Sequence, residues 1–189
     1  MKKLLVVAAL ASTFMATSAF AQSYIGFGVG SSRVSGVDGT EAGLTFTGGN
    51  TSKGSVKIYG GFKFTPTWGL EAQYSDLGRR NLTVTNGAGA VVGTVDTRAS
   101  QYSLAGTGTL PIAQSFALIG KLGVSANRGS GGGSSSNKTS LMAGVGVSYS
   151  ITPRLAARLE YEDFGKFADG LNGSSVRANN TSLNLQYAF

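Results

Sequence analysis

Residues 181–189 at the end of the chain, TSLNLQYAF, alternate between apolar and polar or small side chains. Leu183, Leu185, Tyr187 and Phe189 fall on one side, and Ser, Asn, Gln and Ala residues make up the other. A two-residue period is that of a β-strand. A strand with one broad apolar face and one wet face fits the wall of a transmembrane β-barrel, in which side chains point alternately to lipid and to the lumen. On this interpretation, the rest of the chain should contain more strands of the same kind.

The first 21 residues have the three parts of a secretory signal. Met1-Lys2-Lys3 is basic, residues 4–15 are mostly apolar, and Ala19-Phe20-Ala21 is a small-x-small cleavage site. We expect cleavage after Ala21, which leaves residues 22–189 as a single barrel domain. The alternative is an N-terminal core helix; the apolar stretch is too short for a membrane-spanning helix.

Composition narrows the class of protein without deciding it. The chain has 29 Gly, 3 Pro and no Cys, and only 13% of its residues are charged. After the signal, no window has the roughly 18 continuous apolar residues that a transmembrane helix needs. A closed barrel is then the remaining way to span a membrane, because lipid cannot satisfy open backbone groups. Soluble β-sandwiches share this composition. The formal net charge of +7 falls to +5 when Lys2 and Lys3 leave with the signal.

Eight segments of the chain show the two-residue alternation. Each has about the nine to eleven residues that a tilted strand needs to cross a bilayer. The pattern predicts an all-β fold, an eight-stranded antiparallel up-and-down transmembrane β-barrel. The segments are residues 24–32, 56–65, 68–77, 99–110, 116–126, 141–150, 155–164 and 181–189.

The connections between these segments alternate in length. Three are short turns, and each contains or adjoins one of the three prolines, where a missing N–H costs no ladder bond. Four are long, rich in Gly, Ser, Asn and Thr, and expected to be mobile loops. Short turns and both termini on one side, with long loops on the other, are typical of the bacterial outer membrane and not of a soluble sandwich. The short turns are residues 66–67, 111–115 and 151–154, and the long loops are residues 33–55, 78–98, 127–139 and 165–179.

Aromatic residues gather at the short-turn ends of the predicted strands. This clustering indicates a girdle at the inner, periplasmic interface of the membrane. Strand propensity alone would not place aromatics at one end. The predicted girdle comprises Phe64, Trp68, Phe116, Tyr149, Tyr187 and Phe189, with Tyr24 close by.

Two stretches resemble a known family. Residues 55–79, SVKIYGGFKFTPTWGLEAQYSDLGR, and residues 144–165, GVGVSYSITPRLAARLEYEDFG, are similar to strand pairs of the transmembrane domain of outer membrane protein A type porins. The resemblance implies a structural protein with at most a small pore. It also implies that the terminal pattern, here Tyr187 and Phe189, is read by the barrel assembly machinery. No peptidoglycan-binding domain follows, so cell-wall anchoring is not expected.

Several charged residues fall on the inward side of the predicted strands, where charges are expensive unless paired or solvated. An eight-stranded barrel is just wide enough to be filled by its own side chains. We therefore predict an internal ion-pair network formed by Glu71, Lys121, Arg158 and Glu160. The alternative is a narrow or gated ion path along the same charges. The inward charges are Lys57, Lys63, Glu71, Lys121, Arg158, Glu160 and Glu162.

The sequence gives little support for catalysis, and no cofactor or metal is expected. The chain has no His, so a serine lacks its ordinary partner for proton removal, and metal sites lose their commonest ligand. Glu160 and Glu162 share a strand face, but their spacing is not specific to a carboxylate-pair enzyme. Gly26-x-Gly28-x-Gly30 is better explained by small residues in a tight lumen than by nucleotide binding.

The outer loops carry an excess of basic residues. A basic outer rim would favour the phosphates of lipopolysaccharide, although ordinary solvated charge explains it equally well. An adhesin role would lie in residues 78–98 or 33–55, with an unknown host or surface ligand. Nucleic acid is not expected as a partner, because no basic patch interleaved with aromatics is present. Three functions stay open: a structural barrel contacting outer-membrane lipid and lipopolysaccharide, a small channel, and a surface-binding protein.

Overall fold

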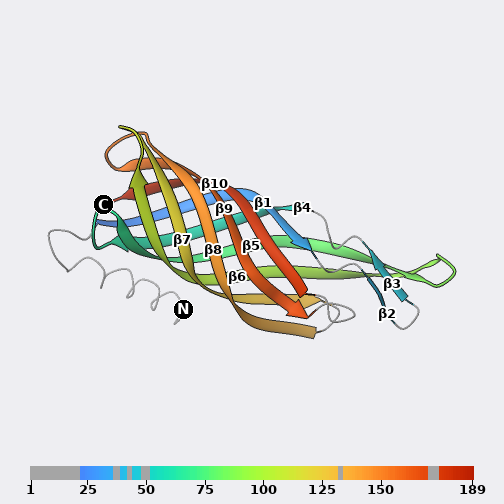
Figure 1. Cartoon of the computed structure of the whole chain (residues 1–189). Helices are drawn as coiled ribbons and strands as arrows, with labels where there is room; N and C mark the ends of the chain where they lie inside the picture. The colour runs from blue at the N-terminus through green and yellow to red at the C-terminus, as the bar shows by residue number, and fades with distance from the viewer. Residues whose placement is uncertain (1–21, 36–38, 42–43, 48–51, 132–133, 170–174) are drawn as a thin grey trace, which may run out of the picture.

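The computed structural model describes residues 22–35, 39–41, 44–47, 52–131, 134–169 and 175–189. The predicted signal peptide and its cleavage after Ala21 lie outside these residues. Ten strands are found in the described chain, and eight long ones form the wall of a barrel (Figure 1). The wall strands are β1 (Gln22–Ser35), β4 (Ser52–Lys63), β5 (Trp68–Asn86), β6 (Val91–Pro111), β7 (Phe116–Gly131), β8 (Ser134–Ser150), β9 (Leu155–Asp169) and β10 (Ser175–Ala188). The two short strands are β2 (Gly39–Glu41) and β3 (Leu44–Thr47).

The barrel closes between its first and last strands. β1 pairs with β10 from Tyr24 opposite Ala188 to Ser35 opposite Arg177, and it pairs with β4 on its other side. All neighbouring wall strands are antiparallel and follow the order of the chain. The predicted eight-stranded up-and-down barrel is therefore confirmed. Closure leaves the wall with no open edge. In the described part of the chain, no helix is long and apolar enough to cross a membrane.

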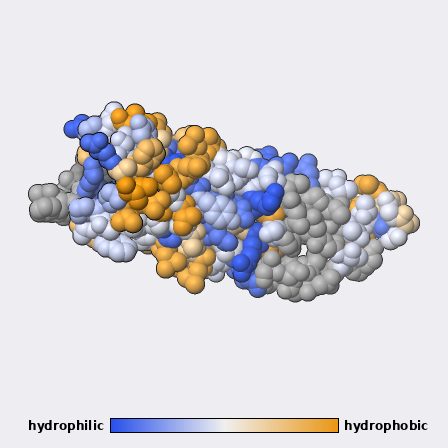
Figure 2. All heavy atoms as spheres, turned by 45° about the horizontal axis from the view of Figure 1, so that its top comes forward, coloured by the Kyte–Doolittle hydropathy of each residue, from blue (hydrophilic) through white to orange (hydrophobic). Residues whose placement is uncertain are grey.

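The wall is apolar outside and polar inside, the reverse of a soluble domain. On β10, Leu183 is 60% exposed, while its neighbours Ser182 and Asn184 are buried. On β1, Phe27 is 56% exposed between two inward glycines. Apolar side chains gather over the wall on the face shown in Figure 2. Such a surface is stable only against lipid. We call these exposed apolar side chains of the wall strands the lipid-facing band.

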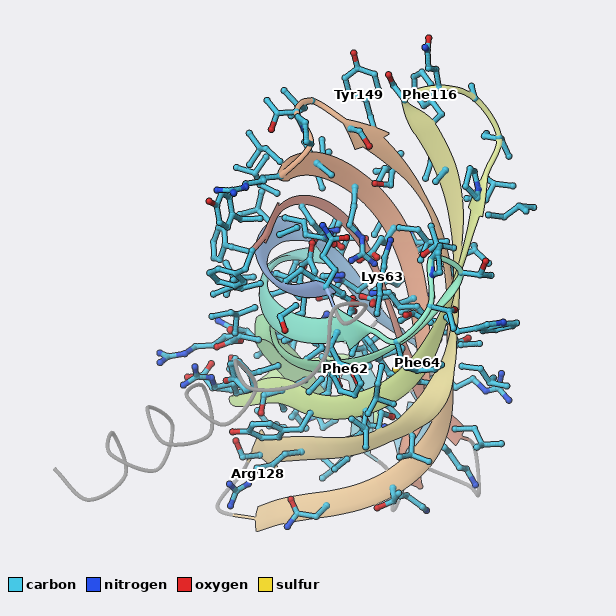
Figure 3. All side chains as sticks on the ribbon, turned by 90° about the vertical axis from the view of Figure 1, so that its left-hand side faces the viewer. Phe62, Lys63, Phe64, Phe116, Arg128 and Tyr149 are labelled. Carbon is cyan, nitrogen blue, oxygen red and sulfur yellow. The ribbon has the colours of Figure 1, made fainter. Side chains whose placement is uncertain are left out.

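Aromatic side chains border the lipid-facing band at the turn end of the barrel. Phe116 and Tyr149, on β7 and β8, point away from the barrel there (Figure 3), with ring centroids 4.9 Å apart. All six predicted members of the girdle are exposed at this end. Tyr24 does not join them: its ring is 5% exposed and lies in the lumen. The prediction for Tyr24 was wrong because it lies on the inward side of β1, in phase with Gly26.

Most of the predicted outer loops are strands. β5 continues to Asn86 and β6 begins at Val91, so residues 78–98, expected as a mobile loop, form a paired ribbon with a turn at Gly89 (φ +80°). β7, β8, β9 and β10 also extend beyond their predicted ends. The alternation disappears there because water solvates both faces, while backbone pairing continues. β3 pairs with β2 and, over residues 83–86, with β5. We call these strands, together with the outer part of β6, the surface arm, which projects from the barrel (Figure 1).

Two matching Asp-x-Gly bulges interrupt the wall at its outer end. In Asp76-Leu77-Gly78 on β5, the Gly78 N–H donates to Asp76 Oδ1 at 2.9 Å, and Gly78 has φ +82°. On β9, the Gly165 N–H donates to Asp163 Oδ1 at 2.7 Å, and Gly165 has φ +67°. The strand ladders shift register at both places. The middle residue Leu77 follows Gln73 and Ser75 in the inward phase, and Phe164 follows Glu160 and Glu162. After the bulge on β5, the inward phase shifts by one residue to Arg80.

Candidate functional site in the barrel lumen

Six charged side chains from four strands meet inside the barrel. They come from β4, β5, β7 and β9, and all are almost completely buried. Three are positive and three are negative, so the formal charges cancel. A neutral, mutually paired set is the form in which buried charges are tolerated. We call these residues the lumen cluster: Lys57, Glu71, Lys121, Arg158, Glu160 and Glu162.

Lys121 lies at the centre of the lumen cluster. Its Nζ is 2.6 Å from Glu71 Oε1, 2.9 Å from Glu160 Oε1 and 3.1 Å from Glu162 Oε1. Arg158 Nη1 donates to Glu71 Oε2 at 3.0 Å, and its Nη2 pairs with Glu160. The structure thus brings together the four residues predicted as a network, Glu71, Lys121, Arg158 and Glu160.

Lys57 and Glu162 complete the cluster. Lys57 Nζ lies 3.0 Å from Glu162 Oε2 and also pairs with Glu160. Both residues were expected to point inward but were left out of the predicted network. The four predicted residues are already neutral and leave Lys57, Lys63 and Glu162 as the other inward charges, so charge balance did not single out Lys57 and Glu162. Lys63, the remaining inward charge, is only partly buried near the inner end (Figure 3), and it has no ion pair with the described residues.

Two tyrosines pack against the cluster on its inner side. The Tyr24 hydroxyl donates to Glu71 Oε2 at 3.0 Å. The Tyr59 ring lies near three cations: its centroid is 4.9 Å from Arg158 Cζ, 5.3 Å from Lys57 Nζ and 5.5 Å from Lys121 Nζ. Aromatic faces attract cations at such distances. Tyr59 is in phase with Lys57 on β4, but its contact with three cations could not be predicted from strand alternation.

The glycines of β1 make room for this packing. A Cβ on Gly26 would lie 2.2 Å from Tyr59 Cζ, and one on Gly28 would lie 1.8 Å from Asn184 Oδ1. Asn184 Nδ2 in turn donates to Glu160 Oε2 at 3.1 Å. The Gly26-x-Gly28 pattern therefore serves close packing in the lumen, as predicted.

A polar layer and then an apolar layer lie on the outer side of the cluster. Gln73 Nε2 donates to Glu162 Oε2 and to Ser75 Oγ, both at 3.3 Å. Beyond them, Ser125 Oγ and Asn127 Nδ2 donate to the Phe164 carbonyl at 2.9 and 3.0 Å. The side chains of the apolar layer pack into one buried cluster. Its members are Val34, Leu77, Ala105, Met142, Phe164 and Ala178.

The terminal aromatics lie outside the lumen. Tyr187 and Phe189 are exposed at the inner end with ring centroids 5.5 Å apart, and the Phe189 N–H donates to the Ser23 carbonyl at 3.0 Å. Their side chains are free to contact lipid or another protein. Among the described residues, no group of three or more His, Cys, Asp or Glu is arranged to hold a metal ion.

A closed barrel with a lipid-facing exterior and a polar, ion-paired interior defines the class of transmembrane β-barrels. The chain matches the family model described as outer membrane protein beta-barrel domain over residues 4–189, and it belongs to that family. The resemblance to outer membrane protein A type barrels is thereby confirmed at the family level. The protein is located in the bacterial outer membrane.

Solved outer-membrane barrels share the fold at low sequence identity. Ail, the attachment invasion locus protein of Yersinia pestis, was solved with the heparin analogue sucrose octasulfate; it is 21% identical over 90% of this chain and 99% of its own, with a TM-score of 0.59. Neisserial surface protein A is 20% identical over 88% of this chain and 97% of its own, with a TM-score of 0.61. OprG from Pseudomonas aeruginosa is 13% identical over 90% and 96%, with a TM-score of 0.59. A comparison with curated proteins found no match.

Proposed function

We propose that the protein is a structural, non-enzymatic barrel of the outer membrane whose lumen is closed by its own side chains. The observation that supports this most directly is the neutral lumen cluster, in which Lys121 contacts three carboxylates within 3.1 Å. An ion crossing the barrel would have to separate these pairs. Leaving a buried charge without its partner is strongly unfavourable, since removing one partner of a buried pair costs about 3–5 kcal/mol.

The apolar layer supports the same proposal independently. Leu77 and Phe164 are completely buried at the outer side of the cluster, so breaking an ion pair does not by itself open a hydrated path. Moving a hydrated ion through an apolar constriction requires it to lose water. A closed lumen therefore has two barriers of different chemistry in series.

A small channel is the second candidate, and the same charges motivate it. The cluster extends across the lumen from β4 and β5 to β7 and β9. In a gated channel, Arg158 or Lys121 would exchange one carboxylate partner for another and open a polar route. This function requires the apolar layer to part as well.

Planar-bilayer conductance separates the two candidates. The test compares the unmodified barrel with the double variant Glu71→Ala/Arg158→Ala, using Leu183→Ala on the lipid-facing side as the matched control. For a structural barrel, we expect unchanged conductance and a lower midpoint of urea unfolding in the double variant. Measurable conductance of the unmodified barrel that changes several-fold in the double variant, and not in the control, would establish the channel.

The outer rim and the inner end supply the proposed partners. We propose that the outer rim contacts lipopolysaccharide, because basic residues such as Arg79 and Arg128 lie exposed just outside the lipid-facing band. The barrel assembly machinery would contact Tyr187 and Phe189.

An adhesin function would use the surface arm formed by β2, β3, β5 and β6. Its test is whether a barrel lacking residues 82–95 inserts normally but loses attachment to host cells.

A further inference from the structure

Three arginines from neighbouring strands form a row outside the lipid-facing band. Arg79 of β5 lies directly opposite Arg98 of β6, and Arg128 of β7 lies opposite Ser100 of β6. Ser100 and Arg98 are two residues apart and face the same side of the sheet. Arg98 therefore has Arg79 directly across one ladder and Arg128 diagonally across the next, within reach of long side chains.

All three arginines point away from the barrel. They are exposed, whereas the alternate residues Arg80, Gln101 and Asn127 are buried. Figure 3 shows the Arg128 side chain directed outward. We call Arg79, Arg98 and Arg128 the arginine row.

The arginine row is only partly neutralised by the protein. Like charges directly opposite each other on a sheet are destabilising. Asp76 pairs with Arg98, and Asp96 faces the same side two residues farther along β6. The row and these two carboxylates sum to +1. In the described part of the chain, neither Arg79 nor Arg128 has an ion pair.

Lipid contact begins immediately on the membrane side of the row. Tyr74 and Tyr102 lie opposite each other there with ring centroids 4.9 Å apart, and β6 and β7 add Leu104 and Val124 to the exposed surface. Paired tyrosines at the end of an apolar band are typical of the headgroup level of a membrane. A lipid whose acyl chains cover these side chains would place its headgroup against the arginine row.

The other end of the barrel has no similar row. The three inner turns, residues 64–67, 112–115 and 151–154, contain a single charged residue, Arg154. The cations are thus concentrated at the outer leaflet. In an outer membrane, this leaflet contains the phosphorylated glycolipid of lipopolysaccharide.

We propose that the arginine row binds the phosphate groups of lipopolysaccharide. Arg79 and Arg128 donate to phosphate oxygens, while Arg98, held by Asp76, bridges between them. The planar guanidinium fork suits bidentate contact with phosphate, which makes arginine better than lysine for such a site. This inference rests on the proposed contact of the outer rim with lipopolysaccharide, and it assigns that contact to one face, β5 to β7.

Native mass spectrometry of the full chain in detergent tests the site, with diphosphoryl lipid A as the probe. The variant is Arg79→Gln/Arg98→Gln/Arg128→Gln, and the control Arg33→Gln/Arg154→Gln/Arg177→Gln removes the same charge elsewhere. The expected result is at least about a tenfold loss of bound lipid A in the first variant and less than about twofold in the control. Equal losses in both variants, or no loss in the first, would overturn the site.

A competition with inorganic phosphate and a single-residue variant complete the test. Inorganic phosphate in millimolar excess should not displace lipid A; full displacement would show a site for free phosphate and overturn the lipid assignment. If the triple variant does not fold, Arg128→Gln alone provides the test, because Arg128 has no ion pair in the described chain, and a loss smaller than in Arg177→Gln contradicts the proposal. Conductance of the same variants reports separately on the closed barrel, so each proposal can fail without the other.

Discussion

Leu77 and Phe164 occupy equivalent places in the two Asp-x-Gly bulges of β5 and β9, and both side chains are completely buried in the same apolar layer. The two bulges are far apart in sequence, yet each has a large apolar residue at its middle position, and the strand alternation directs both side chains into the lumen. In the described part of the chain, side chains of the wall strands therefore form this apolar closure of the lumen.

Truncating either residue should weaken this closure. Leu77→Ala is expected to lower the free energy of unfolding by about 2–5 kcal/mol and Phe164→Ala by about 3–5 kcal/mol, because each leaves a cavity in the apolar layer. Urea titration of the barrel in lipid vesicles measures the change. Leu183→Ala is the control, since this lipid-facing side chain leaves no internal cavity. An equal effect of all three substitutions would contradict the assigned role.

The bulge itself should depend on its glycine. Gly78→Ala introduces a Cβ 2.7 Å from the Gly54 carbonyl oxygen and places it on a backbone with φ +82°. The left-handed backbone alone costs about 1–2 kcal/mol for a residue with a Cβ. Gly93→Ala, with no neighbouring atom within 4 Å of its Cβ, is the matched control and should have little effect. Heat-modifiable gel migration compares the two, and equal melting temperatures would show that the bulge tolerates a side chain.

The stability of the barrel should depend more on the charge balance of the lumen cluster than on any one of its residues. Glu71→Gln leaves Lys121 and Arg158 short of one carboxylate and is expected to lower unfolding stability by about 3–5 kcal/mol. Glu71→Gln/Lys121→Met restores neutrality. We expect the double variant to lose less stability than the sum of the two single variants. A double-mutant cycle in urea measures this coupling, and additive losses would mean that the residues act independently.

The close packing of Gly26 on β1 against Tyr59 on β4 can be tested by substituting both residues. Gly26→Ala should destabilise the barrel because its new methyl group meets the Tyr59 ring at 2.2 Å. In a Tyr59→Leu background, the same substitution should have a smaller effect, since the ring is gone. The measurement is the difference between the two changes in unfolding free energy. No difference would indicate that Gly26 is needed for a reason other than space for Tyr59.

Assembly should depend on the terminal aromatic more than on an equivalent aromatic elsewhere. Phe189 and Phe64 are both exposed at the inner end, 61% and 52% respectively. If the assembly machinery reads Phe189, then Phe189→Ser lowers the amount of folded barrel in cells severalfold, and Phe64→Ser does not. Both variants should fold alike from urea into vesicles without the machinery. Equal folded amounts in cells would contradict a terminal signal.

Much of the wall and lumen could be predicted from the sequence because lipid imposes a pattern on it. Arg158 and Glu160 fall in phase with each other and out of phase with Leu159, so their inward direction follows from one strand alone. The partners of these residues could not be predicted in the same way. Which inward side chains meet depends on the tilt and stagger of the strands, and this is why Lys57 was missed although its direction was right.

The outer strands were missed for a different reason. Beyond the lipid-facing band, β5 and β6 have water on their faces, so residues such as Thr83 and Thr94 need no alternation to pair. Tyr24 was misplaced because an aromatic at the inner end of a strand suits the membrane interface and the lumen equally well. Only its phase with Gly26 distinguished the two positions.

The unbroken pairing of β5 with β6 limits how the surface arm can change in length. The two strands stay in register from Arg80 opposite Thr97 to Val84 opposite Gly93. Loss or gain of one residue in each strand would turn every side chain beyond that point to the opposite face. Insertions and deletions that preserve the faces must therefore occur as multiples of two in both strands together. An arm that looks like a tolerant loop in the sequence can be resized only in such steps, or at its turn near Gly89.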